Sequence, residues 1–118
     1  MAIIRITDLR LRCIIGANDW EREKKQDVII NIVMHVDISK PSQSDDLNDT
    51  VDYKTIAKKI IKTIEPSEFI LLEKMVQVVM DIVCEHPMVK KAEVRIDKPA
   101  ALRFADSVSV ELTHNKSS

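Results

Sequence analysis

The chain has 118 residues, the size of one domain, and we expect residues 1–118 to form a single domain. Its 18 basic and 19 acidic residues nearly balance and its aromatic content is 3%, which argues against a nucleic-acid-binding protein. No apolar run approaches the roughly 18 residues of a membrane span, and the N-terminus lacks a signal-peptide layout, so we expect a cytoplasmic protein. Cys13 and Cys84 have no CxxC spacing, and we expect both to be buried reduced thiols.

Two strands are predicted in the first third of the chain. Within Ile3–Ile15, the residues Leu9, Leu11 and Cys13 alternate with Arg10 and Arg12, and this period of two is typical of a half-buried strand. A second alternating stretch runs from near Val28 to Ile38. Between them, Gly16 to Gln26 is polar and too long for a tight hairpin turn, so we expect a functional loop there.

The middle of the chain predicts two helices. Residues 39–52 are rich in Ser, Asp, Asn and Pro and are interpreted as a loop. Isoleucines then recur every four residues, which predicts an amphipathic helix from about Tyr53 to Glu65, ended by Pro66. A second helix is predicted from near Ile70 to a point before Pro87.

The last third predicts two more strands, around residues 92–97 and 107–112, before a polar tail, 114–118, that we expect to fray. The order strand, strand, helix, helix, strand, strand favours an α+β fold. It would have a four-stranded antiparallel sheet with two helices on one face. Such long strands leave open sheet edges, and a closed ring of subunits would cover them.

Four polar residues stand at the ends of predicted elements, where rigid scaffolds often place chemistry: Glu21, Tyr53, Glu73 and Lys98. Each also has a simpler interpretation. Glu21 and Lys98 can be solvated surface charges, Tyr53 can cover the start of a helix, and Glu73 can favour the positive end of a helix dipole. Spacing alone does not decide between these interpretations.

Several segments together resemble the dihydroneopterin aldolase family. They are Gly16–Gln26, Asp46–Tyr53, Phe69–Glu73 and Val94–Pro99, in that order, and the resemblance covers nearly the whole chain. The run Ala101–Ser109 is more similar to one branch, the dihydroneopterin triphosphate 2'-epimerases. Ile15 also stands where many aldolases carry a histidine before the loop glycine.

The resemblance implies the tunnelling fold, in which four subunits close a barrel and two such rings often stack. It implies active sites between subunits, a pterin substrate and no cofactor. Glu73 would bind the 2-amino and N3 groups of the pterin, because a carboxylate can accept two parallel N–H donors. Leu72, Ala17 and Val51 would complete the substrate-binding surface.

The catalytic residues implied by the resemblance are Lys98, Glu21 and Tyr53, the last one from the neighbouring subunit. A triphosphate favours cations at the mouth of the pocket, and the candidates are Arg22, Lys24, Lys25 and Arg103. His35, His86 and His114 lack metal-ligand spacing, so no metal site is expected.

The implied reaction is a retro-aldol cleavage between C1' and C2' of the substrate side chain. The N5=C6 imine of a 7,8-dihydropterin accepts the electrons, so neither a Schiff base nor zinc is required. Re-addition of the aldehyde would give the 2' epimer, and we favour this outcome. Its alternatives are release of glycolaldehyde by a dihydroneopterin aldolase and a non-catalytic, ring-forming pterin-binding protein. The sequence leaves a tetramer and an octamer equally open.

Overall fold

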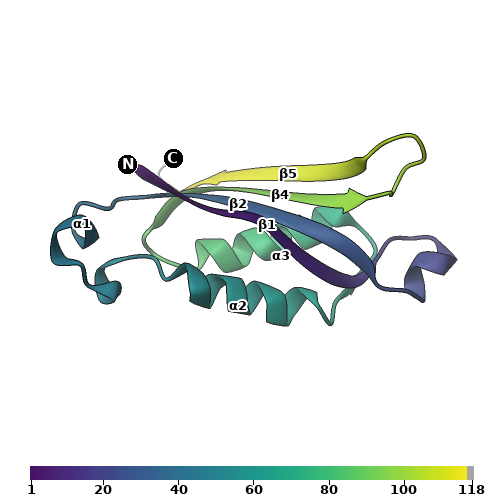
Figure 1. Ribbon diagram of the computed structural model, residues 1–118, viewed down its shortest axis with the longest axis horizontal. Coiled ribbons are helices and arrows are strands. Elements are labelled where there is room, and N and C mark those ends of the chain that lie inside the picture. The colour runs from purple at the N-terminus through teal and green to yellow at the C-terminus, as the bar shows by residue number, and fades with distance from the viewer. Residues whose placement is uncertain (117–118) are drawn as a thin grey trace.

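The computed structural model describes residues 1–116, which form a twisted sheet with two long helices side by side on one face (Figure 1). The strand order across the sheet is β3-β1-β2-β4-β5. The strands are β1 (Ala2–Ile15), β2 (Gln26–Val36), β3 (Glu68–Phe69), β4 (Val89–Pro99) and β5 (Ser107–Asn115). The main helices are α2 (Tyr53–Ile64) and α3 (Leu72–Cys84). The molecule measures 52 × 24 × 22 Å.

The predicted four-stranded antiparallel sheet is confirmed only in part. β1, β2, β4 and β5 pair antiparallel, but a fifth strand, β3, lies parallel to β1 with Glu68 opposite Ile14 and Phe69 opposite Ile15. Two residues are too few to produce an alternating pattern, so the sequence could not signal this strand. The pairing brings the segment before α3 against the end of β1.

A bulge lets the long strand β1 keep one face on the core. Three steps along β1, from Ile6 to Leu9, oppose two steps along β2, from Ile32 to Ile30. The extra residue is accommodated at Asp8, whose φ is +54°. Its backbone N–H donates to Oδ1 of Asn31 at 2.9 Å, and Nδ2 of Asn31 donates back to its carboxylate at 3.1 Å.

The helices bury the residues that their periodicity predicts. On α2 these are Ile56, Ile60 and Ile64, and the carboxylate of Asp52 caps the helix by accepting from the N–H of Lys54 at 3.1 Å. α3 buries a wider stripe of Met75, Val76, Val79, Met80 and Val83 against the sheet. Its predicted start near Ile70 lies two residues before the observed one, because Ile70 and Leu71 are exposed and the backbone of Leu71 is still extended.

The remaining differences lie in the polar segments. Residues 39–52 hold a short helix, α1 (Pro41–Ser44), and a 3-10 turn, η2 (Leu47–Asp49), in place of a continuous loop. The predicted frayed tail is ordered as far as Asn115, since His114 pairs with Ala92 inside β5, and 117–118 lie outside the described residues. Within residues 1–116, no helix is long and apolar enough to cross a membrane.

Candidate active site

A left-handed glycine opens the loop after β1. Gly16, the only glycine in the chain, has φ +127°, a conformation that L side chains rarely adopt. The carboxylate of Glu21 lies directly against it, and a Cβ on Gly16 would overlap all three carboxylate atoms. The glycine therefore provides both the turn and the space for a buried acid.

Glu21 belongs to the 3-10 turn η1 (Asp19–Arg22) and is only 4% exposed. Its Oε1 accepts from the backbone N–H of Asn18 at 3.2 Å and from Nδ2 of the same residue at 2.9 Å. Its Oε2 accepts from Nε2 of Gln26 at 3.2 Å. Two polar side chains of the loop thus orient the carboxylate before any substrate arrives.

Lys98 completes this cluster from the far end of the sequence. It is the residue before the end of β4, its side chain is nearly buried, and its Nζ forms a close ion pair with Oε2 of Glu21. The structure therefore brings together two predicted catalytic residues that stand 77 positions apart. No buried side-chain nitrogen or oxygen among the described residues lacks a hydrogen-bond partner.

Burial alone would raise the pKa of the Glu21 carboxyl. Hydrogen bonds from Lys98, Gln26 and the backbone of Asn18 outweigh that effect and lower the pKa to about 2. The carboxylate is consequently ionised at neutral pH and acts as an acceptor only. Burial raises the pKa of the Cys13 thiol on neighbouring β1, which makes this cysteine an uncharged part of the core.

Arg22 lies next to Glu21, and its guanidinium points at the backbone. It donates to the carbonyl oxygens of Gly16 and Phe69, each at 3.1 Å, and to that of Glu68 at 2.6 Å. The N–H of Gly16 also donates to the carbonyl of Phe69 at 3.2 Å. This predicted phosphate ligand therefore binds the η1 loop to β3.

β3 leads directly into the predicted pterin anchor. Glu73 stands exposed in the first turn of α3, and no side chain within residues 1–116 bonds its carboxylate, whereas Leu72 beside it is buried. Ala17, next to Gly16, is exposed at the same end of the molecule. The free carboxylate and the Glu21–Lys98 pair are thus linked through β3.

Tyr53 and Val51 lie at the opposite end. Tyr53 is the first residue of α2 and 53% exposed, and α2 extends about 18 Å before its end leads to β3. Val51 is buried just before that helix. The segment that carries both residues follows the end of β2 that pairs with Ala2 (Figure 1). One chain therefore does not bring Tyr53 to the Glu21–Lys98 pair.

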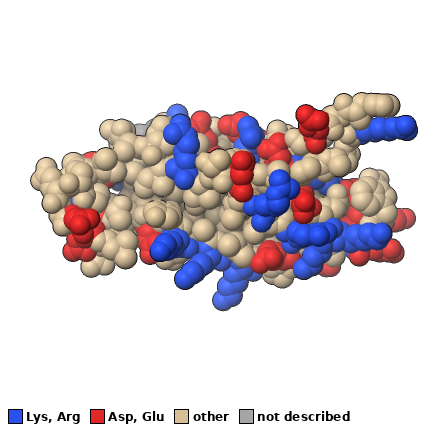
Figure 2. Space-filling model, in the orientation of Figure 1, with Lys and Arg blue, Asp and Glu red and all other residues tan. Residues whose placement is uncertain are grey.

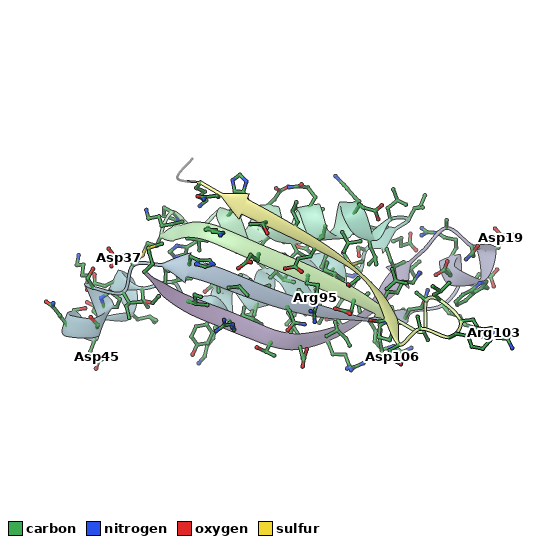
Figure 3. The ribbon with its side chains drawn as sticks, turned by 90° about the horizontal axis from the view of Figure 1, so that it is seen from above. Asp19, Asp37, Asp45, Arg95, Arg103 and Asp106 are labelled. Atoms are coloured by element: carbon green, nitrogen blue, oxygen red, sulfur yellow. The ribbon has the colours of Figure 1, made fainter. Side chains whose placement is uncertain are left out.

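The other predicted phosphate ligands lie on segments at the end of the molecule that holds η1. Lys24 and Lys25 are exposed after η1, and Arg103 lies at the tip of the β4–β5 hairpin, 5.0 Å from the ring centre of the 96% exposed Phe104. Figure 3 places Arg103 at the same end as Asp19 of η1. Figure 2 shows that the basic surface at this end is interspersed with acidic groups.

A surface hollow of about 350 Å³ lies between the η1 loop and the start of the hairpin. Trp20, Gln26 and Ala100 contribute to its walls. Sequence reasoning missed the roles of Asn18 and Gln26, which hold Glu21. In a run of polar residues, nothing in the sequence distinguishes the side chains that hold Glu21 from those that only face solvent.

The three histidines are separated in space. Nε2 of His35 contacts Oε2 of Glu93 at 3.2 Å on the sheet, Nδ1 of His86 accepts from the N–H of Met88 at 3.2 Å, and His114 is exposed on β5. Over residues 1–116, no three side chains of His, Cys, Asp or Glu are grouped to hold a metal ion.

Comparison with known proteins shows the family to which this chain belongs. The family model described as FolB, dihydroneopterin aldolase, matches residues 4–113. The chain belongs to the dihydroneopterin aldolase family. Within it, the chain is 49% identical over 112 residues to the dihydroneopterin triphosphate 2'-epimerase of Escherichia coli K12, covering 95% of this chain and 93% of the relative.

Two further proteins are similar to this aldolase-family chain over nearly their whole length. The dihydroneopterin triphosphate 2'-epimerase of Pseudomonas aeruginosa is 45% identical over 116 residues, covering 98% of this chain and 94% of the relative. A crystal structure of E. coli dihydroneopterin aldolase in complex with neopterin superposes with a TM-score of 0.92 at 28% identity. The match covers 98% of this chain and all of that one.

Proposed function

We propose that this chain is a cytoplasmic, homo-oligomeric enzyme of pterin metabolism that breaks the C1'–C2' bond of a 7,8-dihydroneopterin side chain. Its main reaction would be 2'-epimerisation of dihydroneopterin triphosphate. The buried Glu21–Lys98 ion pair is the observation that carries the catalytic proposal. Both cysteines are free thiols, which fits a reducing compartment.

Glu73 would anchor the pterin. A pyrimidinone edge presents the 2-amino group and N3–H as two parallel donors, and a carboxylate without competing partners can accept both. The exposed carboxylate in the first turn of α3 meets that requirement. Leu72 and Ala17 would contact the ring at the same end of the chain.

The bond changes then follow from the substrate. Loss of the proton from the C2' hydroxyl lets the C1'–C2' bond break, and its electron pair passes through C1' and C6 to N5. Lys98 would supply the proton that N5 takes up, and the ionised Glu21 would hold the lysine in position. The proton released from the C2' hydroxyl would return to Lys98 through water. C2' leaves as the carbonyl carbon of an aldehyde.

Two outcomes share this intermediate. If the aldehyde turns over and C1' attacks its other face, the same bond re-forms and the 2' epimer results. If the aldehyde leaves and C1' takes a proton, the product is 6-hydroxymethyl-7,8-dihydropterin. Identities of 49% and 45% to epimerases, against 28% to the aldolase of known structure, support the epimerase outcome.

Tyr53 would assist proton movement at the C2' oxygen from a neighbouring chain. Its place one helix length from the Glu21–Lys98 pair supports a site between subunits, with Val51 behind it. Closing a barrel of four subunits would pair the outer strand β5 and the outer edge of β1 with neighbouring copies. We propose a tetramer or an octamer of two stacked rings.

The triphosphate would lie at the mouth of the site. Lys24 and Lys25 in the η1 loop and Arg103 in the β4–β5 hairpin are exposed cations on the two segments that form the hollow next to Trp20, and they would bind the phosphates. Arg22 contributes less to this proposal, since three of its N–H bonds are directed at backbone carbonyls.

Product analysis tests the proposal. The protein is incubated separately with 7,8-dihydroneopterin triphosphate and with 7,8-dihydroneopterin, and the pterins are separated by chromatography. We expect the 2' epimer of the triphosphate as the dominant product. Dominant 6-hydroxymethyl-7,8-dihydropterin from the free substrate would make the protein an aldolase. Absence of both products would leave a non-catalytic pterin-binding ring.

A further inference from the structure

One arginine holds together the two halves of the candidate site that a single chain contains. The first half is the Glu21–Lys98 pair on the loop after β1, and the second is Glu73 in the first turn of α3. Arg22 follows Glu21 directly, and its guanidinium contacts carbonyl oxygens of both neighbouring segments. No substrate is needed for these contacts to form.

The hydrogen bonds of Arg22 matter because the strand that they support is very short. β3 has only two residues, and such a short strand fixes its position poorly by ladder bonds alone. Nη1 of Arg22 bridges the carbonyls of Gly16 and Phe69, and Nη2 reaches that of Glu68. Phe69 is four residues before Glu73, so its position sets where α3 begins.

We propose that Arg22 is a positioning residue that fixes the distance between the pterin anchor, Glu73, and the Glu21–Lys98 pair. This inference rests on the proposed function and adds a residue that acts on geometry without touching the reacting atoms. The planar guanidinium suits the role, because its fork of donors can address several carbonyls in fixed directions. A lysine at position 22 offers one freely rotating ammonium.

The experiment compares Arg22→Met with Lys62→Met. Lys62 is exposed in the last turn of α2, so its variant removes one positive charge without touching the site. Turnover is measured per folded chain, well below the unfolding temperature. For Arg22→Met we expect kcat to fall about tenfold, since a small misplacement of reacting groups carries penalties of this size or more. Lys62→Met should retain the wild-type kcat.

Two further measurements separate positioning from other roles. A pterin without a side chain would be anchored through Glu73 and would not need the Glu21–Lys98 pair, so its Kd should change by less than about twofold in Arg22→Met. Arg22→Lys keeps the charge but loses the fork, and we expect kcat to fall as in the Met variant. If Arg22 acts through the pair, adding Arg22→Met to Glu21→Gln should lower kcat by much less than tenfold.

Each alternative has its own signature. A purely structural role predicts a lower unfolding temperature with unchanged kcat in Arg22→Met, and that result overturns the proposal. A phosphate-binding role predicts a raised KM for the triphosphate alone, restored by Arg22→Lys, and also overturns it. Turnover of the wild-type protein tests the proposed function separately. An inactive wild-type protein would overturn both the proposed function and the role of Arg22. An active wild-type protein with an equally active Arg22→Met variant would overturn only the role of Arg22.

Discussion

The two ends of this molecule differ in how completely one chain satisfies its functional groups. At the end that holds η1, each oxygen of the Glu21 carboxylate accepts hydrogen bonds, and the residue is 4% exposed. At the other end, Tyr53 is 53% exposed, and the first turn of its helix is capped without it. A side chain that its own chain neither buries nor needs for capping is free to serve another molecule.

This difference suggests that the two ends of the chain contribute to the site in different ways. At the Glu21–Lys98 end, the ion pair and its hydrogen bonds are already formed within one chain, because charged groups that are buried away from water need partners. Under the proposed function, the Tyr53 end would contribute to a neighbouring chain and would gain its partners only in the assembly. We expect substitutions at the first end to affect both folding and turnover, and substitutions at the second to affect turnover alone.

The largest effect is expected at Lys98. Lys98→Ala removes the proposed proton donor and leaves Glu21 buried without its counter-ion, so turnover per folded chain should fall by at least about 100-fold. Pterin binding through Glu73 should persist. The unfolding free energy should fall by about 3–5 kcal/mol, the usual result of breaking a buried ion pair. Steady-state kinetics, calorimetric pterin binding and urea denaturation measure these three quantities.

Lys62→Ala is the matched control, since it removes an exposed lysine from α2. It should leave turnover and stability near the wild-type values. Wild-type turnover in Lys98→Ala would show that the built-in cluster serves only the fold.

Tyr53 offers the sharpest test of the division between the ends. Tyr53→Phe should leave the unfolding free energy within about 0.5 kcal/mol, as is usual for an exposed position. Turnover should fall about 10–100-fold if the phenol assists proton movement. Activity assays and urea denaturation of the same preparation provide both values.

Mixing then shows whether the two ends meet between chains. Equal amounts of Tyr53→Phe and Lys98→Ala chains, unfolded and refolded together, should recover about a quarter of wild-type activity, because a ring interface can combine the intact half of each chain. The separately refolded variants are the controls. If each chain carried its own whole site, the mixture would be no more active than the two variants alone.

These two ends also show what the sequence could and could not predict. The periods of Ile56, Ile60 and Ile64 and of the long strands predicted the helices and the antiparallel part of the sheet, because each pattern repeats often enough to be read. β3 could not be predicted, since two residues have no period and their place depends on Arg22. That arginine was a predicted phosphate ligand because a sequence shows the charge of a side chain and not the direction in which it points.

The candidate site followed the same rule. Four polar residues at element ends were candidates from the sequence, and only the family resemblance gave them roles: Glu21, Tyr53, Glu73 and Lys98. The structure adds the meeting of Glu21 with Lys98 and the separation of Tyr53 from both. Gly16 had no predicted role of its own, although its positive φ and its contact with the carboxylate explain why a glycine is required.

Gly16→Ala should therefore damage the built-in end through its backbone. The new Cβ would overlap the Glu21 carboxylate, and φ +127° is strained for alanine, so the unfolding free energy should fall by about 1–3 kcal/mol. Displacement of Glu21 should also lower turnover. Urea denaturation measures the first effect, with Lys62→Ala at an exposed position of α2 as the control. An unchanged midpoint would mean that the loop relaxes without loss.

The last prediction concerns the pH dependence of the same cluster. The pKa of Glu21 is lowered to about 2 in the folded chain, against about 4.3 for an unfolded glutamate. The unfolded state therefore binds the proton more readily, and the stability that the ionised carboxylate contributes is present above about pH 4.3 and lost as pH falls towards 2.

Measuring the unfolding free energy of the wild type and of Glu21→Gln between pH 7 and pH 2 isolates this contribution. The difference between the two proteins should be constant from pH 7 to about 5 and then shrink. A difference that stays constant down to pH 2 would mean that the carboxylate is not held in its ionised form by Lys98, Gln26 and Asn18, and the contrast between a preformed and an incomplete end would lose its electrostatic basis.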